Sequence, residues 1–218
     1  MRTIVYIDGY NLYYGLLRDT PWQWLDLEKL ARKLLTPKYE IAEIKYFTAR
    51  IRSERHMPVT PHDQSIYLEA LSQNPLIKII EGCYKRYRAR MPFVKEPCLS
   101  CDKAAYATVW KTEEKQSDVN LSVEITSDIY ENRCDAVVLI SGDSDHCAAL
   151  ALARRRLGKT TVVFNPHQGD CVELRQLSTF CRNIPRDLPA QCQLPDEVPV
   201  GANGRRLHCP PAWKSPEA

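Results

Sequence analysis

The sequence predicts an α/β protein with a mostly parallel sheet that is covered by helices on both faces. Short apolar or β-branched runs alternate along the chain with segments of helical periodicity, and that alternation is typical of parallel sheets. The runs are apolar at nearly every position, as in strands that are buried on both faces. A chain of 218 residues with 44% hydrophobic and 26% charged residues is long enough for one substantial core. We therefore expect one α/β domain with right-handed crossovers.

The individual elements follow from these runs and from the spacing of apolar residues. About five strands are expected, at residues 3–7, 44–51, 76–82, 136–140 and 160–164. Four helices are expected between them, at residues 25–35, 63–72, 118–132 and 145–157. Parallel sheets of this kind bind ligands at the carboxyl ends of their strands, near the point where the strand order reverses. The chemistry is therefore expected just after each apolar run.

Two segments interrupt the alternation. Residues 84–117 are basic and aromatic and form an apparent insertion in a domain that we expect to span residues 1–184. Residues 185–218 contain seven prolines and lose all periodicity. This composition predicts a mobile C-terminal tail.

The composition also limits the kind of protein. Nine cysteines are an odd number and are not spaced as in a small secreted scaffold, so a complete disulfide framework is not expected. Residues 1–17 lack the pattern of a signal peptide, and no apolar run approaches 18 residues. We expect a cytoplasmic protein with no membrane partner. The formal net charge of +3 is too small to identify a partner by itself.

Acidic residues follow two of the predicted strands. The first strand ends in Asp8 and Gly9, with Asn11 one turn further on. The strand at 136–140 is followed by Ser-Gly-Asp-Ser-Asp, which places Asp143 and Asp145 at the same edge of the sheet. A single Asp after a strand is more often a helix cap or a turn former. Two such strand ends together favour a functional site.

A third acid comes from a helix. Asp118 begins the helix predicted at 118–132 and shares its apolar face with Leu121 and Ile125. That face is expected to pack on the sheet and to carry the carboxylate over the strand edge, although Asp118 could instead only cap the helix. Converging carboxylates repel one another unless a cation neutralises them. Oxygen ligands favour Mg²⁺ or Mn²⁺, which would suit cleavage of phosphodiester bonds.

Three motifs carry a resemblance to a known family. Residues 7–15 (IDGYNLYYG), 114–120 (EKQSDVN) and 139–145 (LISGDSD) resemble, in this order, motifs of the NYN domain of PIN-like ribonucleases, particularly its LabA-like branch. The similarity spans roughly residues 1–184. It implies a PIN-like three-layer α/β/α sandwich, a divalent-metal site and hydrolysis of RNA.

The resemblance also suggests roles for individual residues. Asp8, Asp118 and Asp143 match the metal-binding acids of the family, Asn11 matches an amide near that site, and Asp145 matches a further acid. All five are candidate catalytic residues. Asn11 is expected to position a phosphate oxygen or a water molecule. At position 146 such domains often have Phe, so His146 is expected to serve packing rather than metal binding.

A basic and aromatic stretch suggests a surface for nucleic acid. Residues 85–115 carry eight basic and four acidic side chains. Cations contact phosphates and aromatic rings stack on unpaired bases, so this stretch predicts single-stranded RNA as the partner, although it could also be only a solvated loop. The candidate RNA-binding residues are Lys85, Arg86, Tyr87, Arg88 and Arg90, together with Arg50 and Arg52 after the second predicted strand.

One cysteine pair has ligand spacing. Cys98 and Cys101 form a C-x-x-C motif that supplies half of a tetrahedral zinc site, but no second pair follows at the spacing of a zinc finger. Cys83, His56 or His62 could complete a structural zinc site. A second copy of the chain could also supply the missing ligands, and the protein would then be a homo-oligomer.

These observations together predict a metal-dependent ribonuclease. The nearest alternative is a non-catalytic RNA-binding or regulatory module of the same fold. A phosphatase of another α/β fold also uses a strand-end Asp with Mg²⁺, but no Asp-x-Asp follows the first strand. A redox or zinc-dependent interaction protein built around Cys98 and Cys101 would leave the carboxylates unexplained.

Overall fold

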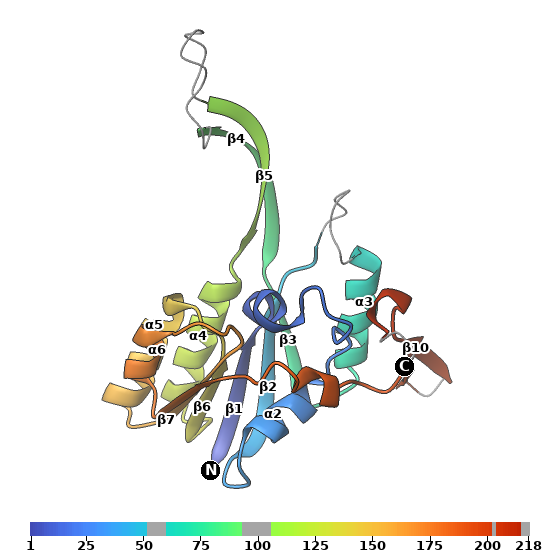
Figure 1. Ribbon diagram of the computed structural model, residues 1–218. Helices are drawn as coiled ribbons and strands as arrows, with labels where there is room; N and C mark the ends of the chain where they lie inside the picture. The colour runs from blue at the N-terminus through green and yellow to red at the C-terminus, as the bar shows by residue number, and fades with distance from the viewer. Residues whose placement is uncertain (52–59, 93–105, 202–203, 215–218) are drawn as a thin grey trace.

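The computed structural model is built around a central sheet of six strands, all paired in parallel (Figure 1). It describes residues 1–51, 60–92, 106–201 and 204–214. The strands of this sheet, in spatial order, are β3 (Ile77–Glu81), β2 (Glu40–Thr48), β1 (Arg2–Asp8), β6 (Ala136–Ile140), β7 (Thr160–Asn165) and β8 (Phe180–Asn183). The order reverses between β1 and β6, so the switch point lies where these two strands end.

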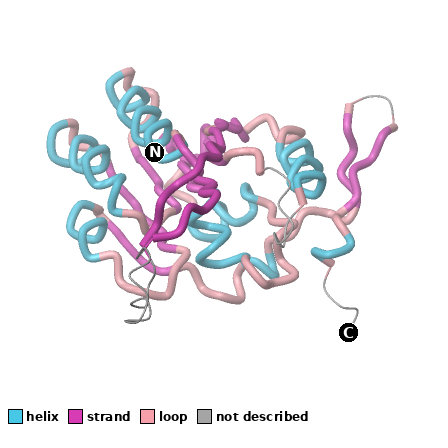
Figure 2. The backbone as a smooth tube through the Cα atoms, turned by 90° about the horizontal axis from the view of Figure 1, so that it is seen from above, coloured by secondary structure: helices cyan, strands magenta, loops and turns pink. Residues whose placement is uncertain are grey.

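Helices cover both faces of the sheet, as Figure 2 shows from above. One face packs on helices α4, α5 and α6, and the other packs on α1, η1, α2 and α3. These helical segments are α1 (Gly9–Leu12), η1 (Tyr13–Leu17), α2 (Leu27–Leu34), α3 (Pro61–Leu71), α4 (Ser117–Tyr130), α5 (Cys147–Ala151) and α6 (Val172–Leu177). Two short turns, η2 (Ser144–His146) and η3 (Leu152–Arg156), flank α5.

Alternation along the strands divides the core between the two faces. In β1, Ile4 and Tyr6 pack with α4, whereas Val5 and Ile7 pack with the helices of the other face. Side chains of successive strand residues point to opposite faces, so an apolar strand supplies both layers at once. The predicted three-layer α/β/α sandwich is confirmed.

The sequence predicted about five strands in the central sheet, and the structure has six. All five predicted strands are present, although β2 begins at Glu40 rather than near residue 44. The additional strand β8 has only four residues and includes Arg182 and Asn183, so no apolar run marks it. It adds to the edge of the sheet by pairing with β7.

The insertion predicted at 84–117 is a long antiparallel hairpin. Its strands are β4 (Cys83–Pro92) and β5 (Tyr106–Lys115), and they form a two-stranded sheet of their own. Figure 1 shows this hairpin rising from the carboxyl-terminal edge of the central sheet, away from the body of the domain. It is therefore placed beside the edge where ligands are expected.

The prediction of a mobile C-terminal tail is wrong for the part of the tail that the structure describes. Trp213 is 4% exposed and Cys192 is fully buried, and both belong to the core that also holds α2 and α3. The indole nitrogen of Trp24 donates a hydrogen bond to the Pro195 carbonyl at 2.8 Å. The segment contains η4 (Pro189–Gln191), the hairpin of β9 (Glu197–Val200) and β10 (Arg205–His208), and η5 (Pro211–Trp213). Proline-rich composition suggested mobility, but the few large side chains between the prolines anchor the segment.

Among the described residues, no helix has the length and apolar character needed to cross a membrane.

Candidate metal centre

Asp8 lies at the end of β1, directly at the switch point of the sheet. Its side chain caps α1, with Oδ1 accepting a hydrogen bond from the Asn11 backbone N–H at 2.9 Å. Oδ2 accepts a second bond from the Ser141 hydroxyl, which follows β6, at 3.0 Å. Asp8 is 4% exposed, so its carboxylate is buried and held from two strand ends at once. Asp8 therefore caps α1 and also belongs to the candidate site.

The loop after β6 is fixed by the same two strand ends. The side-chain Oδ1 of Asn11 accepts a hydrogen bond from the Gly142 backbone N–H at 2.8 Å. A side chain at position 142 would collide with the Asn165 amide, so only glycine allows this approach. Asp143 follows, with its N–H donated to Ser141 Oγ at 3.1 Å and its Oδ1 capping the next turn through the Asp145 N–H. Asp8 and Asp143 are therefore both tied to Ser141, which follows β6.

Asp118 reaches the site from the first turn of α4. The chain turns from β5 into this helix at Gln116, which has a φ of 83°. The Glu114 carboxylate then accepts hydrogen bonds from the backbone N–H and the hydroxyl of Ser117, at 3.1 and 2.6 Å. Asp118 is half-buried. Desolvation and the neighbouring charges of Asp8 and Asp143 raise its pKa to about 6. Asp8 and Asp143 are therefore close enough to Asp118 to disfavour its ionisation in the absence of a cation.

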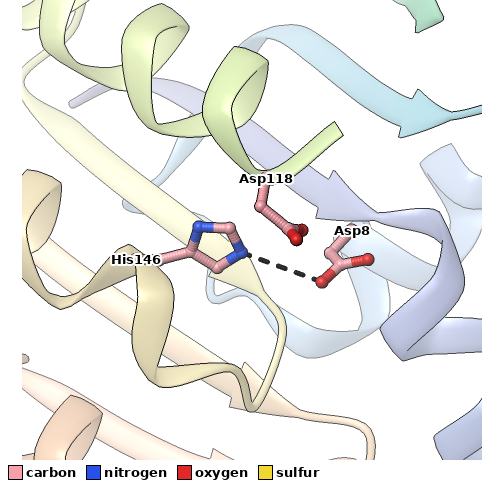
Figure 3. A group of neighbouring side chains, drawn as sticks. All are labelled: Asp8, Asp118 and His146. Atoms are coloured by element: carbon pink, nitrogen blue, oxygen red, sulfur yellow. Dashed lines mark ion pairs between the residues drawn. The ribbon is translucent and has the colours of Figure 1, made fainter. Parts of the chain in front are cut away.

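His146, which the sequence predicted to serve packing, is buried next to two of the acids. Its Nε2 lies 3.7 Å from Asp8 Oδ2, and Figure 3 shows the ring beside Asp8 and Asp118. The residue is fully buried, and among the described residues Nε2 has no hydrogen-bond partner. Its Nδ1 lies 3.2 Å from the Ser122 hydroxyl. A proton on Nδ1, donated to Ser122, would leave the Nε2 lone pair free for a metal ion.

Two overlapping groups of ligand atoms result. One atom each from Asp8, Asp118 and His146 lie within 4.8 Å of one another, and so do one each from Asp118, Asp143 and Asp145. Asp118 belongs to both groups, whereas Asp145 is exposed at the outer side. The donor set is mainly carboxylate oxygen with one imidazole nitrogen. Such a set of side chains could hold a metal ion.

A nearby acid of α4, Glu124, belongs to another cluster. Its carboxylate accepts a hydrogen bond from the Lys45 ammonium at 2.5 Å, and Lys45 also donates to Asp128 at 2.5 Å. Lys45 is fully buried, and Asp128 also accepts a bond from the Tyr6 hydroxyl at 2.6 Å. This network joins the sheet to α4 and lies apart from the two groups of ligand atoms.

The β4–β5 hairpin sorts its predicted RNA-binding residues onto two faces. Arg86 and Arg88 lie over the ring of Trp110, at 5.0 and 5.4 Å from its centroid, and Arg90 lies over Tyr106 at 4.9 Å. We call this side the arginine face. Successive strand residues point to opposite sides, so Lys85 and Tyr87 lie on the other side. There the Tyr87 hydroxyl donates to Glu113 at 2.8 Å.

The remaining predicted residues lie elsewhere. Arg50 follows β2, and its Nε donates to the two carboxylate oxygens of Glu81, at the end of β3, at 3.0 and 2.9 Å. Its Nη1 also donates to the Ser65 hydroxyl at 3.4 Å, so the charge of Arg50 is already paired. Arg52, Cys98 and Cys101 lie outside the described residues.

A cavity of about 270 Å³ lies on the other side of Asp8 from α4. Gly9 and Tyr10, the residues directly after Asp8, form part of its wall. Half of its lining residues are aromatic, and these come from α1, η1, β2, α3, β4 and the C-terminal segment: Tyr10, Tyr13, Tyr14, Tyr46, Tyr67, Tyr84 and Trp213. We call it the aromatic cavity. The sequence did not predict it, because its walls come from six separate segments.

Comparison with known proteins agrees with the fold and the motifs. The NYN domain family matches residues 2–179. One relative, 6-hydroxy-3-succinoylpyridine 3-monooxygenase HspA of Pseudomonas putida, is 32% identical over 91% of this chain and 72% of its own length. A solved structure of a protein of unknown function from Vibrio parahaemolyticus has a TM-score of 0.50 at 15% identity, covering 85% of this chain and 94% of that one, which is a likeness of fold. With its parallel sandwich, its three motifs and this match over most of its length, the chain belongs to the NYN domain family, which has a PIN-like nuclease fold.

Proposed function

We propose that the protein is a metal-dependent ribonuclease that hydrolyses phosphodiester bonds, with single-stranded RNA as its substrate. The observation that carries the proposal is the convergence of Asp8, Asp118 and Asp143 at the switch point of the sheet, within two overlapping groups of ligand atoms. Membership of the NYN family, whose domains act on RNA, supports the same reaction.

The residues at this edge fit a divalent cation. Asp8, Asp118, Asp143 and His146 would hold it, with Asp145 available at the exposed side. The unpartnered, buried Nε2 of His146 supports this assignment, because buried polar atoms are normally paired. When bound, Mg²⁺ or Mn²⁺ would offset the charge of the phosphate and activate water for attack.

The surrounding residues hold these ligands in place. Ser141 donates to Asp8 and accepts from the N–H of Asp143, so one hydroxyl fixes the carboxylate of Asp8 and the backbone of Asp143. Asn11 holds the loop between them through Gly142. Because these ligands are preorganised, they need little rearrangement when negative charge develops on the phosphate in the transition state. Such preorganisation is a major source of catalysis in sites of this kind.

The arginine face supports RNA as the substrate. Trp110 is 58% exposed, and Arg86 and Arg88 hold their guanidinium groups over its ring. An exposed ring with adjacent cations suits the stacking of an unpaired base and contact with its phosphates. Lys85 and Tyr87 lie on the opposite side of the hairpin and would contact RNA only if it wrapped around both faces.

The decisive experiment is an assay with labelled single-stranded and double-stranded RNA and DNA, in Mg²⁺, Mn²⁺ or EDTA. We expect cleavage of single-stranded RNA that EDTA abolishes and Mn²⁺ restores, and we expect Asp143→Asn to lower the rate at least about 100-fold. Glu131→Gln, at the far end of α4, is the matched control and should cleave as the wild type does. Equal cleavage by wild type and Asp143→Asn would disprove the assignment.

The same assay separates the enzyme from a non-catalytic RNA-binding module. Such a module would bind single-stranded RNA, through residues of the hairpin, without cleaving it under any metal condition. The complete set of acids favours the enzyme, because a binding module has no need to bury a carboxylate such as Asp8 beside Asp118 and His146.

A second candidate function is oxygenation of a pyridine-type ring. The observations that favour it are the 32% identity to a protein named as a pyridine-compound monooxygenase and the aromatic cavity beside Asp8. A monooxygenase transfers one atom of O₂ to its substrate and reduces the other to water with two electrons from a reductant. Incubation with a hydroxypyridine, O₂ and a nicotinamide reductant, followed by mass spectrometry of the products in ¹⁸O₂, tests this. Absence of labelled product rules it out for that substrate.

A further inference from the structure

The aromatic cavity contains an unusual concentration of unpaired polar atoms. The structure gives four buried side-chain polar atoms without a hydrogen-bond partner among its described residues. One is His146 Nε2 in the metal centre. The other three are Tyr13 OH, Gln23 Oε1 and Trp213 Nε1, and all three residues line the aromatic cavity. Each unpaired buried group is costly, so three around one cavity indicate a ligand that would pair them.

The three atoms have complementary hydrogen-bonding capacity. The Trp213 indole N–H can only donate, Gln23 Oε1 can only accept, and the Tyr13 hydroxyl can do either. Trp213 is 4% exposed, so its N–H has little access to water. A matching ligand therefore needs both an acceptor and a donor.

The size and walls of the cavity restrict the ligand further. An engineered cavity of about 150 Å³ holds benzene, so about 270 Å³ accommodates one flat ring with substituents or a fused pair of rings. Its aromatic walls favour stacking against a planar ring. Arg18 lies at the cavity with its guanidinium 5.6 Å from the Tyr14 ring. It forms an exposed ion pair with Asp19 at 3.4 Å, and an acidic substituent of a ligand would compete with Asp19 for this cation.

We propose that the aromatic cavity binds a planar nitrogen heteroaromatic ring that carries both an in-plane acceptor and an in-plane donor. Trp213 donates to the ring acceptor, Gln23 accepts from the ring donor, and Tyr13 completes the pairing. The C-terminal segment, through Trp213, is thereby part of a binding site.

Two sources could provide such a ring. If the proposed ribonuclease function holds, on which this part rests, the ring is an unpaired base of the RNA next to the phosphate at the metal centre, because Gly9 and Tyr10 join the cavity to Asp8. The other source is a free heteroaromatic acid. Both have the same ring chemistry, and they differ in what is attached to it.

Isothermal titration calorimetry in EDTA tests the proposal without any dependence on cleavage. The probes are the four nucleoside 5′-monophosphates, 6-hydroxynicotinate as a free heteroaromatic acid, and benzoate as a flat ring without ring heteroatoms. We expect at least one heteroaromatic probe to bind about 10-fold or more tightly than benzoate, since the ring hydrogen bonds each contribute to affinity. Equal binding of benzoate, or no binding of any heteroaromatic probe, overturns the proposal.

Variants locate the binding in the aromatic cavity. Tyr13→Phe removes only the hydroxyl, whereas Gln23→Met removes Oε1 together with Nε2, which donates to the Thr20 carbonyl at 3.2 Å. Both variants keep the side-chain volume, and each is expected to weaken binding about 2- to 10-fold. Tyr130→Phe, on an exposed tyrosine of α4 outside the cavity, is the matched control and should bind as the wild type does. Thermal unfolding of the free Tyr13→Phe protein should be unchanged or higher, because the variant removes an unpaired buried group. Unchanged affinity in both cavity variants overturns the proposal.

The outcomes separate this inference from the proposed function. Binding of a nucleotide supports RNA as the source of the ring, and binding of 6-hydroxynicotinate alone supports a free acid. If a ring binds but RNA is never cleaved, the cavity site stands and the ribonuclease assignment fails. If RNA is cleaved but no ring binds, the ribonuclease assignment stands and the cavity site fails.

Discussion

The side-chain Oδ1 of Asn11 accepts a hydrogen bond from the backbone N–H of Gly142 at 2.8 Å, and this one bond joins the loops that follow β1 and β6. The two loops carry Asp8 and Asp143, which come from strands more than a hundred residues apart in the chain. An amide at position 11 therefore acts on the metal centre by setting the distance between its acids. Its oxygen is already engaged, so Asn11 is a positioning residue in this structure.

Replacing Asn11 should loosen the metal centre. Asn11→Ala leaves the partly buried Gly142 N–H without its acceptor, which should lower the free energy of unfolding by about 1–3 kcal/mol in urea titrations. It should also weaken Mn²⁺ binding, measured by calorimetry. Asn11→Asp keeps an oxygen acceptor and should retain most of the Mn²⁺ affinity. Equal Mn²⁺ affinity in Asn11→Ala and wild type would show that the bond does not position the acids.

The sequence predicted this centre well where the signal was local. Asp8 and Asp143 each follow an apolar strand directly, so the parallel sheet alone brings them to one edge. Asp118 was predicted from its place on an apolar helix face, and α4 does carry it there. Asn11 was placed near the site, but its partner Gly142 depends on how two loops meet, which no periodicity encodes.

Features that depend on distant segments were not predictable in this way. His146 lies one residue beyond a recognisable motif, and only the packing of its turn against α4 directs Nε2 to Asp8. The aromatic cavity draws on residues from Gly9 to Trp213. The C-terminal segment was expected to be mobile because prolines dominate its composition, yet a few buried side chains such as Trp213 fix it. The strand β8 was missed for a similar reason. Two of its four residues, Arg182 and Asn183, are polar, and its pairing with β7 rather than its own pattern makes it a strand.

The role of His146 can be separated from packing by substitution with phenylalanine. His146→Phe removes Nε2, which has no partner among the described residues, together with Nδ1, which contacts the half-buried Ser122 hydroxyl. Because the gain from losing the unpaired Nε2 offsets the loss of that contact, the metal-free protein should be as stable as the wild type or more stable in thermal unfolding. The same change should weaken Mn²⁺ binding about 10- to 100-fold, because a nitrogen ligand or its immediate support is lost. Opposite effects on stability and metal affinity are the signature of a ligand. If Mn²⁺ affinity does not change, His146 serves packing, as the sequence suggested.

The buried cluster around Lys45 should matter for stability and not for the reaction. Lys45→Met leaves the buried carboxylate of Asp128 without its ammonium partner and should cost about 3 kcal/mol in urea unfolding, although Arg133 and Tyr6 still contact Asp128. Lys45→Met combined with Asp128→Asn should cost less than the sum of the two single changes, since the charges are coupled. Mn²⁺ affinity should stay at the wild-type value in all three variants. A loss of metal binding in a folded Lys45→Met protein would contradict this separation.

The same cluster gives a stability effect at alkaline pH. Burial alone would lower the pKa of Lys45, but the hydrogen bonds to Asp128 and Glu124 outweigh it and raise the pKa on balance. A group whose pKa is higher in the folded state contributes stability that is fully present below its unfolded pKa of about 10.4 and is lost as pH rises through the folded value. Wild type should therefore lose more stability than Lys45→Met between pH 9 and pH 11 (about two units around that value) in urea titrations. Parallel losses in the two proteins would show that other groups dominate this range.

The arginine face of the hairpin should determine RNA affinity through Trp110. Trp110→Ala removes the exposed ring on which a base would stack and should weaken binding of single-stranded RNA about 5- to 150-fold, measured by fluorescence anisotropy in EDTA so that no cleavage occurs. Val109→Ala is the matched control, because Val109 is 40% exposed but points to the opposite side of the same strand. Arg88→Gln should weaken binding less and should reduce the slope of log affinity against log salt by about 0.7, the value for one phosphate contact on a single strand. An equal loss of RNA affinity in Trp110→Ala and Val109→Ala would show that binding depends on the folding of the hairpin and not on the Trp110 ring. If Trp110→Ala binds single-stranded RNA with wild-type affinity, RNA does not bind at the arginine face.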